Sequence, residues 1–531
     1  MEEEIKQREN QVLNFLKNKL HLSNKYTLTL IGILLFAFII RLYYFIQTYD
    51  QTVWWDAAEH LSKGLDIAGK LTFEPLWGYH NDIGSPLLWA AFFKLGLGEI
   101  AIRIFIFFMS MLGVFMTYLV GKEIVEKKAA LIATACMSFF YLHLFYSMRP
   151  LSGLLTSSLW LVAIYFFWKG YVKKEHPAYL YLSAAFAAIS FWIYYSIGLL
   201  FPTLLIFLLI TDRFRFLRAK HLYGAAVLAF TIILPKMIFN MIHIGRPISR
   251  TKSLAANSSV VVESKISYLF QYIAYMPSYL KVPLLIVFII GLIYILMKII
   301  LGLDYIIKSK YPEGRSYLFL ILWIIPIFFG FSWHAFVGSG HFEPRYLMPI
   351  FPAVFLIAGV ALSKLYDYIR KFNKYLAPAV IILIVVLGGV FQLAHAHNLI
   401  MSKKDSYKEI KEAALWMREN SEPDDLIIGL SQPQLNYYAR REATFSYKPD
   451  LTTSIRNQTE VVNNVILERQ PKFLMLSMYE QHAQRGLAWV DPWVKKNNES
   501  IVPVKVFTMN YRGEKVPAVI IYEFKDYDFN E

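Results

Sequence analysis

The sequence predicts a polytopic α-helical membrane protein with a small α/β domain at its C-terminal end. Of the 531 residues, 56% are hydrophobic, and the mean hydropathy is +0.41, which is unusual for a soluble domain. Many apolar runs approach the roughly 20 residues that a helix needs to cross a bilayer. Near residue 400 the composition changes from apolar to mixed, which indicates a domain boundary.

About eleven membrane spans are expected from length and hydropathy. Lys and Arg concentrate in every second connecting loop, as in the segments 122–128, 169–174 and 213–220. The positive-inside rule places these loops and the basic head in the cytoplasm, and an odd number of spans places the tail outside. The spans are expected near 27–46, 100–121, 128–147, 151–168, 178–195, 197–211, 221–240, 281–302, 317–335, 346–363 and 376–397.

The domain organisation follows from this topology. Residues 1–26 are expected to form a cytoplasmic head, 27–398 a transmembrane domain, and 399–531 an extracytoplasmic α/β domain. Two long exterior loops, 47–99 and 242–280, belong to the transmembrane domain. We therefore expect an integral, multi-pass protein of the cell membrane.

Charge and cysteine content argue against several classes of function. The orienting loops and anionic lipid account for the net charge of +15, so no nucleic-acid partner is predicted. Cys136 is the single cysteine of the sequence, so an intrachain disulfide is excluded and thiol catalysis is not expected. The tail contains no G-x-G-x-x-G motif, P-loop or metal-type Cys/His cluster.

The first exterior loop contains the most informative stretch, WWDAAEHL, at residues 54–61. It places Asp56 and Glu59 beside two tryptophans at a membrane interface, where acidic groups are costly and often functional. At a spacing of three residues the two carboxylates would share one helix face. Capping of the following helix is the structural alternative for Asp56.

The remaining exterior segments are less specific. The apolar stretch 87–97 is too short to span and is expected to lie in the interface as an amphipathic helix. The loop 242–280 is basic against the positive-inside pattern, so Arg246 and its neighbours form either a mobile lid over an anionic ligand or a solvated loop. In the tail, helices are expected near 410–417 and 461–469, and strands near 425–430, 472–478, 502–508 and 516–524.

Two arginine residues at the exterior ends of spans suit a phosphate ligand. Arg345 opens the tenth expected span and Arg103 the second. A guanidinium binds phosphate through bidentate, charge-assisted hydrogen bonds, and Arg246 is a third candidate. Snorkelling to lipid head groups is the alternative for the two arginines at span ends.

A lipid-linked sugar phosphate fits these groups, because its tail partitions among apolar helices and its phosphate lies at the interface. Asp56, desolvated by Trp54 and Trp55, would be the base that takes the proton of an acceptor hydroxyl, with Glu59 assisting. Alternatively, the two acids would hold a divalent cation such as Mg²⁺ or Mn²⁺ against the phosphate. Further candidate substrate contacts are Trp55, His60, His80, His341, Glu343 and Tyr346.

These motifs resemble those of the GT-C class of membrane glycosyltransferases, in particular the protein O-mannosyltransferase-like superfamily, which includes the aminoarabinose transferases of lipid A. The resemblance covers most of the chain. It rests on WWDAAEHL (54–61), GSPLL (84–88), GEIAIR (98–103), PRYLMPI (344–350), AALWMREN (413–420), Asp424-Asp425 and Tyr437-Tyr438.

The resemblance implies a hexosyl- or pentosyltransferase of the mannosyltransferase type. It would move a sugar from a polyprenyl- or dolichyl-phosphate donor to a hydroxyl of a lipid, glycan or protein, outside the cytoplasm and with inversion. The family usually carries adjacent Asp and Glu in the first loop. Here Asp56 matches the Asp, whereas Ala57 replaces the Glu and leaves Glu59 as the second acid.

Three alternatives were weighed. The triplet at 54–56 is similar to the WWDYG signature of oligosaccharyltransferase catalytic subunits, but that signature lies in their soluble C-terminal part, so this function is not assigned. A transporter or flippase of lipid-linked sugars would need acids and broken helices near the bilayer midplane. A non-catalytic membrane scaffold would use the tail to bind partners.

Overall fold

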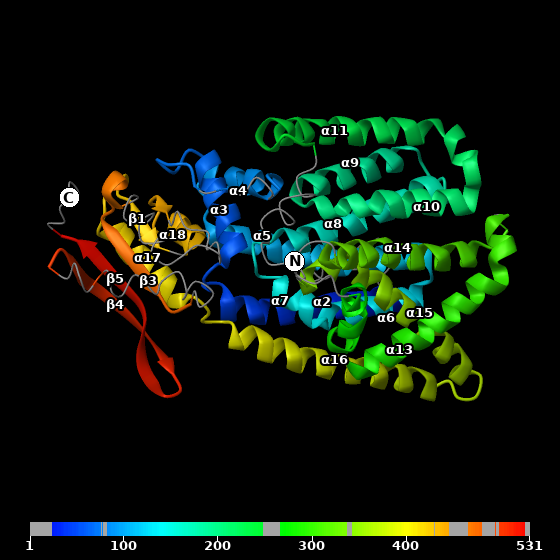
Figure 1. Ribbon diagram of the computed structural model, residues 1–531. Coiled ribbons are helices and arrows are strands. Elements are labelled where there is room, and N and C mark those ends of the chain that lie inside the picture. The colour runs from blue at the N-terminus through cyan, green and yellow to red at the C-terminus, as the bar shows by residue number, and fades with distance from the viewer. Residues whose placement is uncertain are drawn as a thin grey trace, which may run out of the picture. The chain divides into compact units, whose positions relative to one another are not determined.

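The computed structural model (Figure 1) describes residues 24–75, 77, 82–247, 266–308, 310–336, 342–429, 431–444, 466–479, 494 and 499–525. The chain forms two compact units. The helical unit comprises residues 1–47, 104–148 and 152–401, and the α/β unit comprises 48–103, 149–151 and 402–531. The first exterior loop thus folds together with the tail, whereas the expected domain limits at 26 and 398 stay predictions.

Within the described residues, eight helices are long and apolar enough to cross a membrane. The predicted helical membrane fold is therefore confirmed, whereas the count of eleven spans is not. These eight are α2 (Lys25–Thr48), α5 (Glu99–Ile124), the segment Ile197–Arg218 with α10 (Leu200–Asp212), α11 (Lys220–Ile244), α13 (Ser267–Ile307), α14 (Pro312–His334), the segment Pro344–Arg370 with α15 (Phe351–Arg370), and α16 (Leu376–Ser402).

The other three expected spans are helical but shorter. The segment 128–147 is broken at Phe140 into α6 (Lys127–Phe139) and α7 (Tyr141–Tyr146). The segments 151–168 and 178–195 form α8 (Ser152–Phe167) and α9 (Ala178–Ile193), each of 16 residues. Hydropathy could not separate these helices from full spans, because packing inside the protein and contact with lipid both favour apolar residues.

Gln392 of α16 forms hydrogen bonds with backbone groups at two helix breaks in the helical unit. Its side-chain oxygen accepts a hydrogen bond from the amide of Tyr141 at 3.1 Å, where α7 begins. Its side-chain nitrogen donates to the carbonyls of Tyr279 and Leu280 at 2.9 and 3.0 Å. These carbonyls precede Lys281, whose non-helical backbone breaks α13. Inside a membrane such breaks persist only where another protein group replaces the lost helical hydrogen bonds.

The predicted loop 242–280 is helical at both ends. Helix α11 ends at Ile244, and α13 begins at Ser267, so residues 267–280 form a helix where a loop was expected. The start of α13 is apolar and aromatic, which allows it to pack or to face lipid. Residues 248–265 lie outside the described part of the chain.

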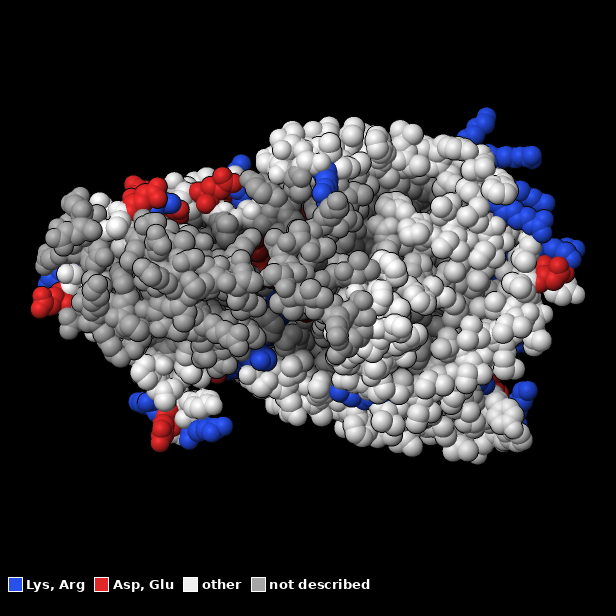
Figure 2. Space-filling view, in the orientation of Figure 1, with Lys and Arg blue, Asp and Glu red and all other residues white. Residues whose placement is uncertain are grey.

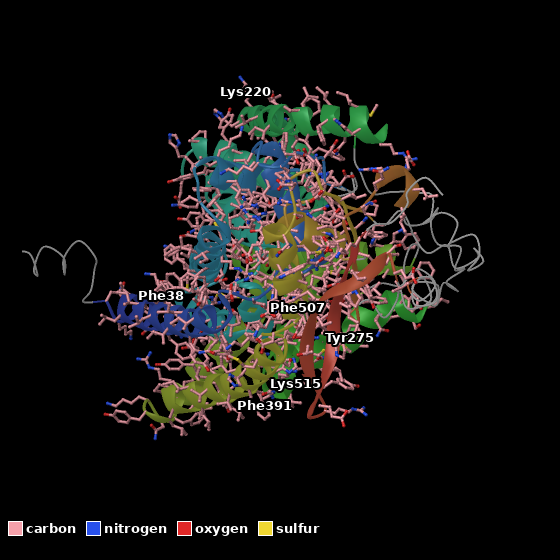
Figure 3. The ribbon with its side chains drawn as sticks, turned by 90° about the vertical axis from the view of Figure 1, so that its left-hand side faces the viewer. Phe38, Lys220, Tyr275, Phe391, Phe507 and Lys515 are labelled. Atoms are coloured by element: carbon pink, nitrogen blue, oxygen red, sulfur yellow. The ribbon has the colours of Figure 1, made fainter. Side chains whose placement is uncertain are left out.

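Several helices present large apolar side chains outward. Phe230 on α11 and Phe391 on α16 are 56% and 51% exposed, and Figure 3 labels Phe391. In a helix of membrane-spanning length, such exposed side chains are suited to contact with lipid tails. By contrast, α15 is almost completely buried over its first ten residues and forms the centre of the helical unit.

Two glycines allow α15 to approach its neighbours closely. A Cβ atom at Gly359 of α15 would collide with the carbonyl oxygen of Ala129 on α6, and one at Gly291 of α13 would collide with the carbonyl oxygen of Ile357. We expect Gly359→Leu to destabilise the protein by about 1–3 kcal/mol, because overpacking forces the two backbones apart. Thermal unfolding in detergent measures the effect. The control is Gly32→Leu on α2, where an added Cβ meets no atom within 4 Å; an equal loss in both variants would contradict the packing argument.

The α/β unit combines two helices from the first loop with the folded tail. The loop forms α3 (Trp55–Ile67) and α4 (Gly84–Lys94), so the helix expected at 87–97 is confirmed. Its position in the membrane interface stays a prediction. The tail adds α17 (Lys408–Glu419) and α18 (Gln432–Tyr438).

The sheet of the tail has the order β2-β1-β3-β5-β4. Strand β1 pairs in parallel with β2 and β3, and the last three strands pair antiparallel. Figure 3 labels Phe507 on β4 and Lys515 on β5. The predicted helix near 410–417 and four predicted strands are confirmed, whereas α18 and β2 were not predicted. Of the expected helix 461–469, the structure describes residues 466–469 as helical. The strands are β1 (Ile427–Gly429), β2 (Ala443–Thr444), β3 (Phe473–Ser477), β4 (Ile501–Tyr511) and β5 (Glu514–Phe524).

Candidate active site

The two candidate acids lie on α3 of the α/β unit. Trp54 occupies the position before the helix, and Asp56 lies in its first turn, where the helix dipole favours a carboxylate. Asp56 is therefore the second residue of the helix and does not occupy the cap position, which is Trp54. Ala57 and Ala58 are buried, whereas Asp56 and Glu59 are half-buried. The helix thus holds both acids beside its apolar face while leaving them accessible.

The tail anchors the backbone segment that leads into α3. The amide of Val53 donates to the phenol oxygen of Tyr438 at 2.9 Å, and the side chain of Gln51 donates to the carbonyl of Lys403. Lys411 of α17 forms an ion pair with Asp50, with 2.6 Å between Nζ and Oδ1. Each contact joins the first loop to the tail within one compact unit, which fixes the start of α3.

The two tyrosines of α18 act as neutral groups in this arrangement. Tyr437 and Tyr438 are buried, and burial together with the Glu99 carboxylate raises the pKa of both phenols well above the ordinary value. Both side chains therefore keep their protons at neutral pH. Tyr438 can accept the Val53 hydrogen bond without introducing a charge beside it.

Tyr438 is therefore expected to act as a positioning residue. Tyr438→Phe would leave the buried Val53 amide without its acceptor and cost about 1–3 kcal/mol of stability. We expect kcat of sugar transfer to fall roughly 10-fold while KM for the donor is unchanged, because Asp56 is displaced but the donor site is not. Steady-state kinetics in detergent measures both constants. Tyr511→Phe, at a 49% exposed tyrosine, is the control, and an unchanged kcat in Tyr438→Phe would reduce the residue to a structural role.

Arg103 is buried and forms its hydrogen bonds within the protein. It is 1% exposed and pairs with Glu99, with 2.8 Å from its Nε and 2.5 Å from a terminal nitrogen to the same carboxylate oxygen. Its guanidinium also donates to the carbonyl of Gln51. These contacts favour a structural role for Arg103, which holds the first loop in place. They argue against the predicted direct contact of Arg103 with a phosphate.

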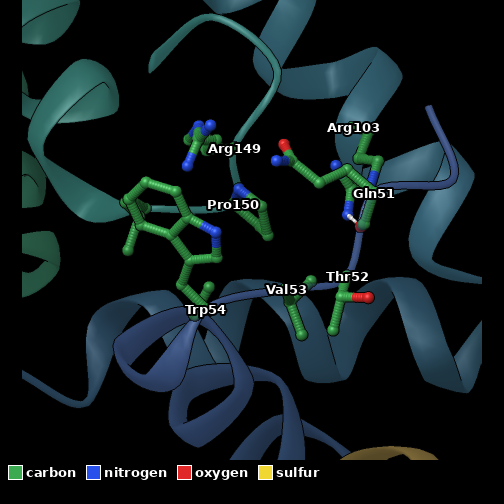
Figure 4. Close-up of a pocket in the computed structure, with 9 residues that line it drawn as sticks. Gln51, Thr52, Val53, Trp54, Arg103, Arg149 and Pro150 are labelled. Carbon is green, nitrogen blue, oxygen red and sulfur yellow. Dashed lines mark hydrogen bonds between the residues drawn. The ribbon is translucent and has the colours of Figure 1, made fainter. Parts of the chain in front are cut away.

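Arg149, which was not predicted from the sequence, belongs to the α/β unit through the short segment 149–151. It is 6% exposed, and its guanidinium carbon lies 3.7 Å from the centre of the Trp54 ring, a cation–π contact (Figure 4). A signal was present, because Arg149-Pro150 follows an apolar segment at an end predicted to be exterior, where the positive-inside rule disfavours a cation.

A small cavity lies between these groups. Its volume is about 10 Å³, room for about one water molecule, and its walls include Trp54, Ala57, Arg103 and Arg149 (Figure 4). Ala57, which stands where the resembling family has Glu, therefore faces a cavity bordered by two arginines. Here Glu99 supplies the carboxylate that pairs with Arg103.

The other candidates of the first loop differ in exposure. Trp55 is 45% exposed, whereas Trp54 is half-buried and packs against the Arg149 guanidinium. His60 is 7% exposed and packs against Trp77, with 5.5 Å between ring centres, which favours a core role over substrate contact. His80 lies outside the described residues.

In the helical unit, three further candidates lie together on the 3₁₀ turn η5 (Pro344–Ile350) and the residue before it. Arg345 Nε lies 3.7 Å from Glu343 Oε2, and the two side chains are 21% and 28% exposed. Tyr346 is buried and stacks on Phe331, with 4.9 Å between ring centres. Arg345 is therefore held beside an aromatic wall but, in contrast to Arg103, stays accessible to a ligand.

The last two candidates receive less support. Arg246 is exposed just beyond the end of α11, so neither the lid nor the solvated-loop interpretation is decided. His341 lies outside the described residues. The site candidates thus form one group around α3 and a second around η5.

A metal site was tested against the donor set. In the described part of the chain, no group of three or more His, Cys, Asp and Glu side chains could hold a metal ion. Asp56 and Glu59 alone supply two carboxylates, so a cation bound there would take its other ligands from a substrate phosphate and water.

Comparisons with known proteins bear on the family and the fold of the chain. Residues 83–239 match the model of the family described as dolichyl-phosphate-mannose-protein mannosyltransferase. No curated protein matches the chain. Of the motifs that carry the resemblance, those at 84–88 and 98–103 lie inside the matched residues, whereas those at 54–61 and 344–350 lie outside them.

Solved structures give the fold. ArnT from Cupriavidus metallidurans, bound to undecaprenyl phosphate, aligns with 92% of this chain and 98% of its own at 13% identity, with a TM-score of 0.62. The oligosaccharyltransferase of Archaeoglobus fulgidus, tethered to an acceptor peptide, aligns with 93% of this chain and 74% of its own at 15% identity, with a TM-score of 0.59. AglB, an oligosaccharyltransferase from Archaeoglobus fulgidus in complex with an inhibitory peptide and a dolichol-phosphate, aligns with 94% of this chain and 74% of its own. The identity is 14% and the TM-score is 0.56. The chain therefore has the fold of the GT-C membrane glycosyltransferases, and its residues 83–239 match the mannosyltransferase family.

Proposed function

We propose that this protein is an integral-membrane glycosyltransferase that moves a sugar from a polyprenyl-phosphate donor to a hydroxyl acceptor on the exterior membrane face. The observation that carries the proposal is Asp56, a half-buried carboxylate in the first turn of α3, whose preceding backbone is anchored by the folded tail. A base that must meet an acceptor needs both features, accessibility and a fixed position.

The proposed reaction is a direct displacement. The Asp56 carboxylate takes the proton of the acceptor hydroxyl, and the acceptor oxygen attacks the anomeric carbon of the sugar. The bond between this carbon and the phosphate oxygen breaks, and its electron pair leaves with the phosphate. One displacement inverts the anomeric configuration, and the phosphate leaves as a stable anion without a strong general acid.

The cationic groups divide into two roles in this proposal. Arg345 binds the donor phosphate, since its side chain is 21% exposed and a guanidinium can form bidentate, charge-assisted hydrogen bonds to a phosphate. Arg103 and Arg149 are positioning residues, because both are buried and bonded to the segment before α3. Glu59 assists Asp56 from the next turn of the same helix.

The alternative role for Asp56 and Glu59 is to bind a divalent cation. It would bridge Asp56 and Glu59 to the donor phosphate and would stabilise charge on the leaving group. Two of the similar structures contain undecaprenyl phosphate and a dolichol-phosphate, which supports a lipid-phosphate donor here. The acceptor peptide tethered to the archaeal oligosaccharyltransferase supports a protein acceptor as one choice among hydroxyl-bearing molecules.

The experiment is transfer of radiolabelled sugar from a panel of polyprenyl-phosphate sugars in sealed vesicles that contain the overexpressed protein. We expect label to move from one or a few monophosphate donors, and only in vesicles that expose the exterior face to the donor. Addition of EDTA, followed by Mg²⁺ or Mn²⁺, decides between the base and the cation-bridging roles. No transfer from any monophosphate donor by the folded protein would contradict the proposal and favour a diphosphate donor or transport.

A further inference from the structure

A second polar site lies in the helical unit, away from the residues assigned to transfer. A pocket of about 550 Å³ opens where three basic connections meet: the turn after α8, the turn between α10 and α11, and the start of α14. All three belong to loops that the positive-inside rule places in the cytoplasm. Four cationic side chains and one carboxylate line the pocket among the described residues: Lys174, Arg215, Arg218, Arg315 and Asp212, with His221 beside them.

The inner part of the pocket is held by a fixed polar group. Asp212, at the end of α10, accepts a hydrogen bond from the phenol of Tyr171 at 2.7 Å. Arg315 donates to the other oxygen of the same carboxylate at 3.2 Å. Asp212, the single acid among the described lining residues, is therefore already paired with Arg315. The other three cations, Lys174, Arg215 and Arg218, lie in the outer part of the pocket.

The outer part is open and strongly positive. Lys174, Arg215 and Arg218 are exposed, and none of them forms an ion pair with a carboxylate of the described residues. Helices α9 and α11 begin at the pocket, since Pro177 and Ala219, the residues before them, line it. The partial positive charge of two helix N-termini adds to the cationic side chains and favours an anion.

One donor of the pocket lacks a partner. The Nε of Arg315 is buried and has no hydrogen-bond partner among the residues described. A buried guanidinium nitrogen without a partner is unfavourable, so a ligand oxygen or water is expected to supply one.

The surroundings indicate a ligand that belongs to the membrane. Phe214 and Leu217 alternate with the arginines along the 3₁₀ turn η3 (Arg213–Arg218) and are 71% and 48% exposed. Tyr223, in the first turn of α11, is 53% exposed. Exposed apolar and aromatic side chains mixed with arginines are typical of a membrane interface. Figure 2 shows Lys and Arg gathered at one end of the visible face, and Figure 3 labels Lys220 at the start of α11.

We propose that this pocket binds the phosphate of an anionic membrane lipid, which Arg215, Arg218 and Lys174 contact from the outer part while the Tyr171–Asp212–Arg315 group closes the inner part. Its volume suits a polar head group rather than a single ion. The site goes beyond sugar transfer, because it uses none of the residues assigned to the donor or the base. A bound lipid would cross-link three loops and stabilise the helical unit.

The test uses the full-length purified protein in a neutral detergent, delipidated and titrated with defined probes. Native mass spectrometry measures binding of phosphatidylglycerol and phosphatidylcholine, and thermal unfolding measures the stabilisation. We expect phosphatidylglycerol to bind and to raise the Tm, and Arg215→Gln/Arg218→Gln to weaken this binding about tenfold or more. The control, Lys371→Gln/Lys374→Gln, removes the same charge from another exposed basic loop and should bind as wild type does.

Each other outcome overturns a stated part of the proposal. Equal loss of binding in both double variants would mean that the charges act only through the general potential of that face. Unchanged binding in both would mean that Arg215 and Arg218 do not hold the lipid, which would overturn the assigned site. Stabilisation by inorganic phosphate as strong as that by phosphatidylglycerol, with the same dependence on Arg215 and Arg218, would replace the lipid by a soluble phosphate compound. A cooperative thermal unfolding transition near the wild-type Tm, measured without added lipid, shows that the variants are folded. Because this control does not depend on transfer activity, a failure of the proposed enzyme function is recognised separately.

Discussion

Asp56→Asn is expected to lower kcat of sugar transfer by about 10²–10⁴-fold while expression and folding stay at the wild-type level. The amide is nearly the same size as the carboxylate but cannot take the proton of an acceptor hydroxyl. Asp56 is half-buried in the first turn of α3, so the loss of its charge should cost little stability. Donor consumption and product formation, measured with purified protein in detergent, give the effect.

Asp66→Asn is the matched control for Asp56→Asn. Asp66 lies on the same helix but pairs with Lys63 at 2.7 Å, so its neutralisation removes an ion pair and no proposed catalytic group. We expect activity within a few-fold of wild type in this control. Wild-type turnover in Asp56→Asn would remove the proposed mechanism, and an equal loss in both variants would point to a general effect on α3.

Arg345→Gln is expected to raise KM for the lipid-phosphate donor about 10- to 100-fold, because a charge-assisted hydrogen bond to a phosphate is lost. The effect on the acceptor should be small. Arg345→Lys should restore part of donor binding, since an ammonium supplies the charge but not the bidentate geometry. Initial rates at varied donor concentration separate KM from kcat.

The control for Arg345 lies at the other end of the same helical segment. Arg370 is exposed in the last turn of α15, and Arg370→Gln should leave both kinetic constants unchanged. If KM for the donor were unaffected in Arg345→Gln, the Arg345–Glu343 pair would be structural, and the donor phosphate would need another cation.

The fold could be predicted to the extent that a local pattern determines it. Long apolar runs identified α2, α5, α11, α14 and α16, because the bilayer sets a minimum length that few soluble helices reach. The same criterion also predicted spans at α6–α9, where the described helices are shorter than 18 residues and do not confirm them. Neither the break at Lys281 nor its satisfaction by Gln392 could be foreseen, because the two residues are 111 positions apart and the contact is tertiary.

The tail was predicted well where strands alternate or form apolar runs, as in β3 and β5. Strand β2 has two residues and α18 has seven, which is too short for a periodic signal. Yet α18 carries Tyr438, which binds the backbone ahead of Asp56. The contacts between the tail and the first loop are therefore the main feature of the candidate site that could not be predicted from the sequence.

The candidate site was predicted from chemistry where residue type and place in the topology coincide, as for Asp56 and Arg345. Arg103 lies near the start of α5, at the end of a candidate span as predicted, but its pairing with Glu99 depends on burial that the sequence does not report. Arg149 and Arg41 were overlooked, although a cation within or at the end of an apolar span is unusual. Arg41 is fully buried in α2 and bonds to Ser110, Ser138 and His143.

The central claim is a single displacement at the anomeric carbon of a lipid-phosphate sugar. The most direct test is a reaction of the purified protein with the donor identified in vesicles, followed by NMR of the product and quantification of the released lipid phosphate. The account predicts one polyprenyl phosphate released for each sugar transferred and an inverted anomeric configuration. Retention of configuration would contradict it, since two displacements and a covalent intermediate would then be required, and so would release of a lipid diphosphate.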